Sequence, residues 1–235
     1  MTKTIIVAAA GKGTRMGELT KDIPKPLIKV LEKPFIFYLL QNIKEAGFEN
    51  IIVVTGYKAE NLETYLKEYD PKIQTVHQFE KVGTEYYGTL GPLKAAKEYI
   101  SDACVWVNGD NLYSPQDLSA LASYNDDYTY VSGMKHKSPS QYGVLKCQNS
   151  FLEDIVEKPK EFVSDIINVG LYKFTTEVFS VLGDVSKSER GEYELVDALK
   201  ILAEKRRVKV HMIQKYWYDF GSPEDISIVE AFLKN

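Results

Sequence analysis

Residues 5–27 read IIVAAAGKGTRMGELTKDIPKPL, and this stretch decides the fold of the chain. Its first six residues are apolar and begin with β-branched side chains, which predicts a short buried strand. Gly11 and Gly13 then let the backbone turn sharply and let a ligand approach closely. Successive backbone N–H groups in such a turn form a concavity that binds anions.

Two basic side chains accompany this turn. Arg15 carries a rigid fork of donors that matches the oxygens of a phosphate. Lys25 stands between Pro24 and Pro26, which we expect to hold the backbone extended and to present the lysine from a stiff segment. The strand, the glycine turn and the two cations together predict a phosphate-handling site.

Two common glycine motifs do not fit the turn. A Walker loop requires glycine and Ser/Thr where this chain has Ile6 and Gly13. The dinucleotide fingerprint requires a third glycine where Met16 stands, and an arginine inside the turn suits close helix packing poorly. An ordinary strand–turn–helix connection with solvated lysines is the simpler interpretation of the two glycines alone.

The composition is that of a soluble globular protein. The 235 residues carry a net charge of −4, which argues against a protein that coats nucleic acid or a membrane surface. Cys104 and Cys147 form no C-x-x-C pair, so we expect buried free thiols, as in the reducing cytoplasm. The three histidines show no catalytic or metal-binding spacing, and we expect structural roles for them.

The first half of the chain alternates between strand and helix patterns. We expect strands at residues 5–10, 51–55, 73–77 and 103–107, and helices at 34–46, 59–69 and 91–100, the last capped by Thr89. This alternation predicts an α/β fold of three layers (αβα) around a Rossmann-like, mostly parallel central sheet.

The second half of the chain has a different pattern of expected elements, with shorter strands separated by turn residues. We expect strands at 128–134, 142–147, 152–156, 168–174 and 208–213, an extended segment at 216–220, and helices at 195–204 and 223–233. No linker interrupts the chain. We therefore expect one domain over residues 1–235, with a first half (1–125) and a smaller, mixed second half (126–235).

The string G-x-G-T-R-M followed by T-x-x-x-P-K-P-L resembles the signature of the sugar nucleotidylyltransferases, also called NDP-sugar pyrophosphorylases. These enzymes join a nucleoside triphosphate to a sugar 1-phosphate. The resemblance runs from Ile5 to Phe232, with its motifs in family order. It implies a catalytic core without the C-terminal β-helix that some relatives carry. It also implies that residues 1–125 form the nucleotide-binding half and residues 126–235 the sugar-phosphate-binding half.

The resemblance implies catalytic roles for three cations. Arg15 would hold the leaving pyrophosphate, Lys25 would neutralise the α-phosphoryl group, and Lys158 would hold the incoming phosphate. The implied nucleotide-binding residues are Ala9, Ala10, Gly11, Gly13, Thr14, Arg15, Lys25, Gln78, Gly88, Thr89 and Asp110. A second Gly-Thr pair begins at Gly83, so the glycine that faces the base, and the base itself, stay open.

Two aspartates are the candidate metal ligands. Asp110 directly follows an apolar strand, where a carboxylate can hold Mg²⁺ against phosphates or simply form a turn. Asp219 lies in W-Y-D-F-G-S-P-E-D before the last expected helix. The resemblance implies that both carboxylates bind one Mg²⁺, the expected cofactor.

The implied acceptor site comes from the second half. The matching motifs are Y-G-V, E-K-P, N-x-G and G-E-x-x-[IL]-x-D, and the residues implied to bind the sugar phosphate are Tyr142, Gly143, Glu157, Lys158, Asn168, Gly170 and Glu194. The last motif contains two acids, and Glu192 stays an alternative to Glu194.

The resemblance implies a cytoplasmic, Mg²⁺-dependent transferase. Its partners would be a nucleoside triphosphate and a sugar 1-phosphate, with no nucleic acid and no membrane, and homo-oligomerisation stays open. Three alternatives remain: a cytidylyltransferase acting on a phosphate such as phosphocholine or inositol phosphate, a non-catalytic nucleotide sensor, and a glycosyltransferase. The sensor is disfavoured because the Arg/Lys pair and both aspartates are present. The glycosyltransferase is disfavoured because G-D-N at Asp110 is not D-x-D.

Overall fold

The computed structural model describes residues 1–234 of the chain. Strand β1 (Thr4–Ala9) lies between β4 (Asn50–Thr55) and β6 (Cys104–Asn108) and is parallel to both, and β5 (Gln74–His77) adds to β4 in parallel. These strands give the order β5-β4-β1-β6. Their carboxyl ends therefore share one edge, which is where ligands bind in open α/β sheets.

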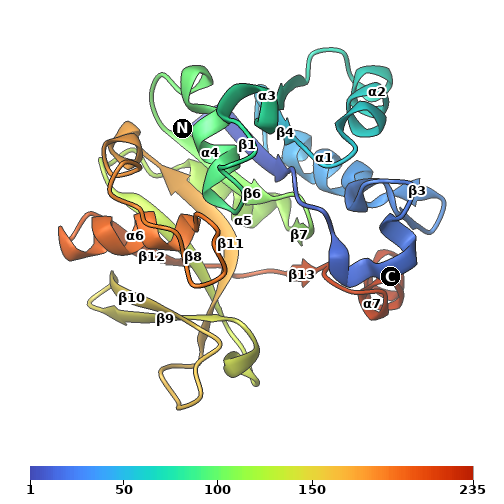
Figure 1. Cartoon of the computed structure of the whole chain (residues 1–235). Coiled ribbons are helices and arrows are strands. Elements are labelled where there is room, and N and C mark those ends of the chain that lie inside the picture. Colours follow the sequence, from blue (N-terminus) through green and yellow to red (C-terminus); the bar gives the residue numbers. More distant parts are fainter. Residues whose placement is uncertain (235) are drawn as a thin grey trace.

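The same sheet continues into the second half of the chain (Figure 1). Strand β11 (Ile166–Phe174) is antiparallel to both β6 and β8 (Thr129–Lys135), and β12 (Val208–Met212) is parallel to β8. An antiparallel pair, β10 (Phe151–Glu157) and β9 (Gly143–Gln148), completes nine strands. The parallel part of the sheet thus belongs to the first half, and the mixed part belongs to the second.

Helices cover both faces of the sheet because successive side chains of a strand point to opposite sides. Ile5 and Val7 of β1 share one buried cluster with α1 (Phe35–Glu45), α2 (Ala59–Tyr69), α5 (Pro115–Ala122) and α7 (Glu224–Leu233). Ile6 shares the other cluster with α4 (Leu90–Ala95) and α6 (Leu195–Glu204). The expected three-layer arrangement is confirmed.

Two short two-stranded sheets lie beside the main one. Strand β13 (Trp217–Asp219) pairs with β7 (Asn111–Tyr113), and β2 (Lys29–Val30) pairs with β3 (Lys33–Pro34). The first of these sheets joins the segment after β6 to the segment before α7. It therefore connects the two halves of the chain at the edge where ligands bind.

Most expected elements are present, and α2 and α6 span the predicted residues. The sequence prediction missed α3 (Gln78–Val82) and α5. Helix α5 has a local signal, because the Ser114 hydroxyl accepts a hydrogen bond from the backbone N–H of Asp117 and Pro115 is the first helical residue. The helix expected at 91–100 is shorter, since α4 ends at Ala95 and a 3₁₀ turn (Lys97–Tyr99) follows.

Thr89 does not cap the helix that follows it, which corrects the prediction. Its side chain makes no capping hydrogen bond to α4. Its hydroxyl instead accepts a hydrogen bond of 2.8 Å from the backbone N–H of Leu195, the first residue of α6. Thr89 therefore caps α6, a helix about a hundred residues further along the chain, through a tertiary contact.

We expect His211 to make the stability of the fold sensitive to acid. Its side chain is buried, its Nδ1 lies 3.2 Å from the hydroxyl of Tyr124, and burial lowers its pKa from the ordinary 6.5. The folded state therefore favours the neutral ring, and stability should fall as the pH falls through and below 6.5.

Comparison with His211→Gln tests this expectation. We expect wild type to lose free energy of unfolding relative to the variant between pH 7.5 and pH 5, as measured by urea denaturation at each pH. A difference that stays constant over this range would contradict the assignment.

Candidate active site

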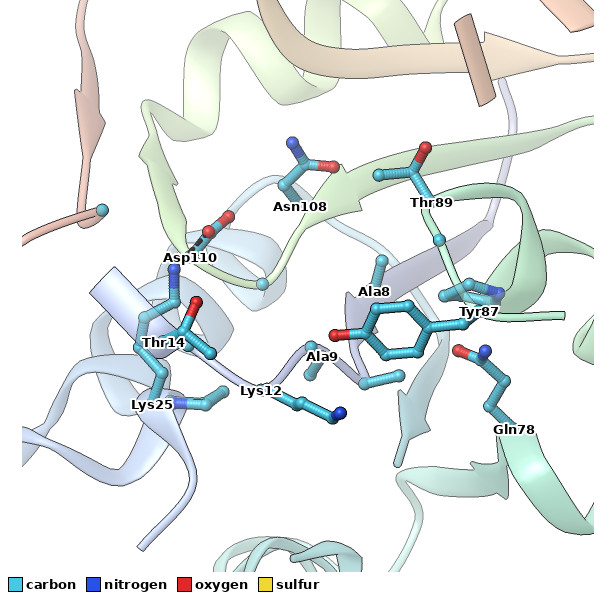
Figure 2. A pocket seen from close by; sticks show the side chains of 18 of the residues that line it. Ala8, Ala9, Lys12, Thr14, Lys25, Gln78, Tyr87, Thr89, Asn108 and Asp110 are labelled. Carbon is cyan, nitrogen blue, oxygen red and sulfur yellow. Dashed lines mark hydrogen bonds and ion pairs between the residues drawn. The ribbon is translucent and has the colours of Figure 1, made fainter. Parts of the chain in front are cut away.

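Two adjoining cavities lie at the carboxyl ends of β1 and β6. The smaller, of about 380 Å³, lies over the glycine turn and is shown in Figure 2. The larger, of about 1010 Å³, is lined mainly by the second half of the chain. The residues common to both cavities are Thr14, Arg15, Thr89, Asn108, Asp110 and Gly221. Ligands in the two cavities would therefore meet beside Arg15 and Asp110.

The glycine turn is packed against Lys25. Gly13 has a φ of +65°, and a Cβ there would lie 2.9 Å from the Cβ of Lys25. Both the left-handed backbone and the close approach require glycine at this position. Ala9, Ala10, Gly11, Gly13 and Thr14, which the sequence assigned to the nucleotide, all line the smaller cavity.

Lys25 is buried and forms an ion pair with Asp110, drawn in Figure 2. The expectation of an extended backbone at Lys25 is wrong, since it begins a 3₁₀ turn (Lys25–Leu27), although Pro24 before it is extended. Proline is tolerated in a first helical turn because its missing N–H is not needed there, so Pro26 does not prevent the turn.

Asp110 and Asp219 line the larger cavity together. The register of β7 and β13 places Asn111 opposite Asp219, and the Asn111 amide donates a hydrogen bond of 2.9 Å to the Asp219 carboxylate. Burial, and then the charge of Asp110, raise the pKa of Asp219 to about 6. Two carboxylates that repel each other in a partly buried site form a donor set that fits one hard divalent cation.

Arg15 lies beside the same two aspartates. Its guanidinium approaches Gly221, where an added Cβ would lie 3.0 Å from Arg15 Nη1 and 2.9 Å from Asp219 Oδ2. Gly221 thus leaves room for both side chains. Arg15 is exposed to solvent at the boundary of the two cavities, in a position to contact a phosphate bound in either one.

The far end of the smaller cavity contains Gln78. Its side chain is only 2% exposed, and its Nε2 donates a hydrogen bond of 2.8 Å to the backbone carbonyl of Tyr86. Gly88, with a φ of +120°, lines this cavity, whereas Gly83 lines neither cavity. Of the two glycines, Gly88 is therefore the one that lines the smaller cavity.

Sequence reasoning missed several residues at this end. Tyr87 lines the same cavity as Gln78 (Figure 2), and the ammonium of Lys12 lies 5.1 Å from the centre of the Tyr87 ring. Trp106, Pro92 and Glu192 also line this cavity. A signal for Tyr87 was present, since an aromatic pair stands between the two Gly-Thr pairs.

Lys158 lies in the larger cavity on a strained backbone. Its φ of +43° is unusual for a residue with a side chain, and its backbone N–H donates to the carbonyl of Tyr142. The ring of Tyr142 packs edge-on against Trp217 at 5.7 Å. Gly143 adjoins Glu157, since a Cβ there would lie 3.0 Å from the Glu157 carboxylate. These predicted acceptor residues are together in one cavity.

Asn168 also lines the larger cavity, but its amide is partly engaged. Its Nδ2 donates to the hydroxyl of Tyr172, and its Oδ1 accepts from the backbone N–H of Gly170. Gly170 has a φ of +69°, and a Cβ there would lie 2.3 Å from the amide of Asn108. The side chain of Asn168 therefore stabilises the local backbone at Gly170, in addition to lining the cavity.

Two acids, Glu192 and Glu194, are the alternatives that the sequence analysis left open for the acceptor site. They lie in different cavities. Glu192 lines the smaller cavity and Glu194 lines the larger one. Both carboxylate oxygens of Glu194 are occupied, by Thr89 and by Arg190. Asp197, in the same motif, lines the larger cavity, and burial raises its pKa. Asp197 is an acid of this cavity that the sequence analysis did not choose.

Within residues 1–234, neither a three-residue cluster of His, Cys, Asp and Glu suited to a metal nor a helix able to cross a membrane is found. The metal hypothesis therefore depends on the aspartate pair alone. Cys104 is a buried free thiol, as expected, and Cys147 is free but only partly buried.

Comparison with known proteins gives consistent matches. Residues 3–235 match a family model described as nucleotidyl transferase. The chain is 34% identical over 231 residues to the bifunctional protein GlmU of Methanocaldococcus jannaschii, covering 97% of this chain and 53% of the relative. It is 29% identical to the UTP–glucose-1-phosphate uridylyltransferase AglF of Haloferax volcanii, covering 97% and 96%. The chain thus spans about half the length of the first of these relatives.

A similar match is found among solved structures. A UDP-glucose pyrophosphorylase in complex with UDP-glucose superposes with a TM-score of 0.86 and 25% identity, covering 100% of this chain and 99% of that one. A putative glucose-1-phosphate thymidylyltransferase from Bacillus anthracis, with 23% identity and a TM-score of 0.84, shares the fold.

Proposed function

The chain belongs to the nucleotidyl transferase family, and we propose that it transfers a nucleotidyl group from a nucleoside triphosphate to a sugar 1-phosphate. The products would be an NDP-sugar and pyrophosphate. The names of the relatives support this reaction class, because they include a uridylyltransferase for glucose 1-phosphate and a sugar-1-phosphate nucleotidylyltransferase joined to an acetyltransferase.

The observation that carries the proposal is the meeting of the two cavities at Arg15 and Asp110. One cavity has the glycine turn and Gln78, which suit a nucleotide, and the other has Lys158 and several hydrogen-bonding side chains, which suit a sugar phosphate. The reaction requires two phosphates to approach each other at one point. Cations and carboxylates are gathered at that boundary.

The proposed reaction is an in-line substitution at the α-phosphorus. An oxygen of the sugar phosphate forms a bond to the α-phosphorus while the bond to the bridging oxygen of pyrophosphate breaks, and the pyrophosphate leaves with that electron pair. Both reactants are anions, so the protein mainly neutralises charge and aligns them. Lys158 would hold the incoming phosphate, Lys25 would contact the α-phosphoryl group, and Arg15 would hold the leaving pyrophosphate.

Asp110 and Asp219 would hold Mg²⁺ in this proposal. The ion would supply positive charge against the phosphates of the nucleotide. The proximity of the two carboxylates supports this assignment, because both line the larger cavity and the charge of Asp110 contributes to the raised pKa of Asp219.

The division into a nucleotide half (1–125) and a sugar-phosphate half (126–235) is part of the same proposal. The distribution of the lining residues supports it, although Glu192 of the second half reaches the smaller cavity. The two free thiols support a cytoplasmic location.

A screen of pyrophosphate release tests the proposed function. The five common triphosphates would each be combined with glucose, galactose, mannose, glucosamine and N-acetylglucosamine 1-phosphates, with Mg²⁺ present. We expect release above background only when both substrates are present, with formation of a nucleotide sugar confirmed by mass spectrometry. No release with any pair would contradict the proposal.

A second candidate is a cytidylyltransferase that acts on phosphocholine. It is favoured by one observation, the perpendicular rings of Tyr142 and Trp217 beside the larger cavity, which could form two sides of a cage for a quaternary ammonium. Adding phosphocholine with CTP to the screen distinguishes the two candidates, because only this one predicts CDP-choline.

The choice of base should depend on Gln78. Replacing it by alanine removes a carboxamide from the end of the nucleotide cavity and should reduce discrimination among triphosphates by about 1–3 kcal/mol. The measurement is kcat/KM for each triphosphate in the wild type and the variant. Gln74→Ala, at an exposed position of β5, is the control. An unchanged preference profile in Gln78→Ala would show that the base is recognised elsewhere.

A further inference from the structure

A network of hydrogen bonds joins the base-side loop (residues 83–89) to the segment that leads into α6 and includes its first residue (residues 188–195). The hydroxyl of Thr89 donates to Glu194 Oε2 at 3.0 Å and accepts from the backbone N–H of Leu195 at 2.8 Å. The other carboxylate oxygen of Glu194 accepts a hydrogen bond of 2.7 Å from Arg190. We call the contacts of Thr89, Glu194, Leu195 and Arg190 the clasp.

Backbone contacts reinforce the clasp. The N–H of Leu90 donates to the carbonyl of Tyr193, and the N–H of Tyr193 donates to the carbonyl of Tyr87, both at 3.0 Å. Gly88 lies so close to this segment that a Cβ would be 2.4 Å from the Tyr193 carbonyl oxygen. The rings of Tyr86 and Tyr193 stack at 5.0 Å. The loop and the segment are therefore packed as one unit.

This unit borders both cavities. Tyr87 and Gly88 line the smaller cavity, and the carbonyl of Tyr86 holds the Gln78 amide. Arg190 and Glu194 line the larger cavity, and Thr89 lines both. A displacement of the loop from the segment would alter the nucleotide end and the acceptor end together.

We propose that Thr89 and Glu194 are positioning residues whose clasp sets the affinity for nucleotide and acceptor jointly. This inference rests on the proposed function for its substrates. It assigns Glu194 to the protein's own structure, because the residue is 7% exposed and both of its oxygens already accept hydrogen bonds. A hydrogen bond to a buried carboxylate is strong, and its loss leaves a charged group unsatisfied.

Three variants test the clasp. Thr89→Val keeps the shape of the side chain and removes both hydrogen bonds, whereas Thr89→Ser keeps the hydroxyl. Thr129→Val is the matched control, because the Thr129 hydroxyl is buried in β8 and has no hydrogen-bond partner among residues 1–234.

We expect Thr89→Val to raise KM for the triphosphate and KM for the sugar 1-phosphate by about tenfold each, which corresponds to the loss of roughly one hydrogen bond to a charged group. The value of kcat should change by less than about threefold, because Arg15, Lys25 and Asp110 lie on other elements. Thr89→Ser should restore both KM values to within about twofold of wild type.

Hydrogen exchange of the substrate-free protein gives a readout that does not depend on activity. The amides of Leu90, Tyr193 and Leu195 should exchange about tenfold faster in Thr89→Val than in wild type or Thr89→Ser. A joint rise of both KM values together with this joint loss of protection supports the clasp.

The proposal is contradicted if Thr89→Val raises only one of the two KM values or behaves like Thr129→Val. It is also contradicted if the amides of Leu90 and Tyr193 keep their protection from hydrogen exchange. It is also overturned if Thr89→Ser is as defective as Thr89→Val. A wild type without turnover in the substrate screen contradicts the proposed function instead, since the exchange experiment still decides whether the loop and the segment open together.

Discussion

Replacing Asp110 or Asp219 by asparagine should lower nucleotidyl transfer by on the order of 10²-fold or more. Asparagine keeps the shape of the side chain and removes one of the two charges that we expect to hold Mg²⁺. Because residues that act as a unit have non-additive effects, the double variant should be little worse than the worse single variant.

The measurement is kcat for pyrophosphate release at saturating Mg²⁺ in both single variants and in the double variant. Asp102→Asn, at an exposed position before β6, is the control for the loss of one negative charge. If the two single effects multiply in the double variant, the aspartates act independently and the shared-metal assignment is wrong.

Measuring the stability of Asp219→Asn shows whether the variant loses activity because it loses a metal ligand or because it no longer folds. The folded state raises the pKa of Asp219 from 3.8 to about 6, so the ionised form is disfavoured in the folded protein. Ionisation of Asp219 therefore lowers the free energy of unfolding. This loss develops as the pH rises from about 4 to above 6 and is complete at pH 7.5.

Without divalent ions at pH 7.5, Asp219→Asn should therefore unfold at a higher temperature than wild type, and the difference should vanish at pH 4. Thermal unfolding in EDTA at both pH values measures this. A variant less stable than wild type at pH 7.5 would show that the charge of Asp219 stabilises the metal-free fold.

The second large effect is expected at Arg15. Arg15→Ala should lower kcat/KM by on the order of 10²-fold or more, because a charge-assisted contact to the departing pyrophosphate is lost. Arg15→Lys should recover only part of this loss, since an ammonium lacks the planar fork of donors. Gly221 leaves the space that the guanidinium uses.

Steady-state kinetics of both variants, with Arg206→Ala as an exposed control, test this prediction. Near wild-type kinetics of Arg15→Ala would remove the glycine turn from the mechanism. Full rescue by lysine would show that charge alone is required.

The sequence by itself determined the layers of the fold and the location of the site. Apolar runs and helical periodicity predicted α2 and α6 to the residue, and the first strand with its glycine turn indicated the region in which the smaller cavity lies. These features depend on interactions within a few residues of one another, such as turn chemistry and the burial of one face of a helix, and they can therefore be recognised in the linear sequence.

Only the tertiary structure decided which of the candidate residues meet. Lys25 pairs with Asp110, Asn111 holds Asp219, and Thr89 caps α6 instead of α4. Each of these contacts joins residues 85 or more positions apart. Such contacts follow from strand order and register, which place one end of β7 against β13 and the base-side loop against α6. Neither periodicity nor turn chemistry indicates that placement. The sequence therefore cannot show whether a polar residue such as Thr89 caps the adjacent helix or a distant one.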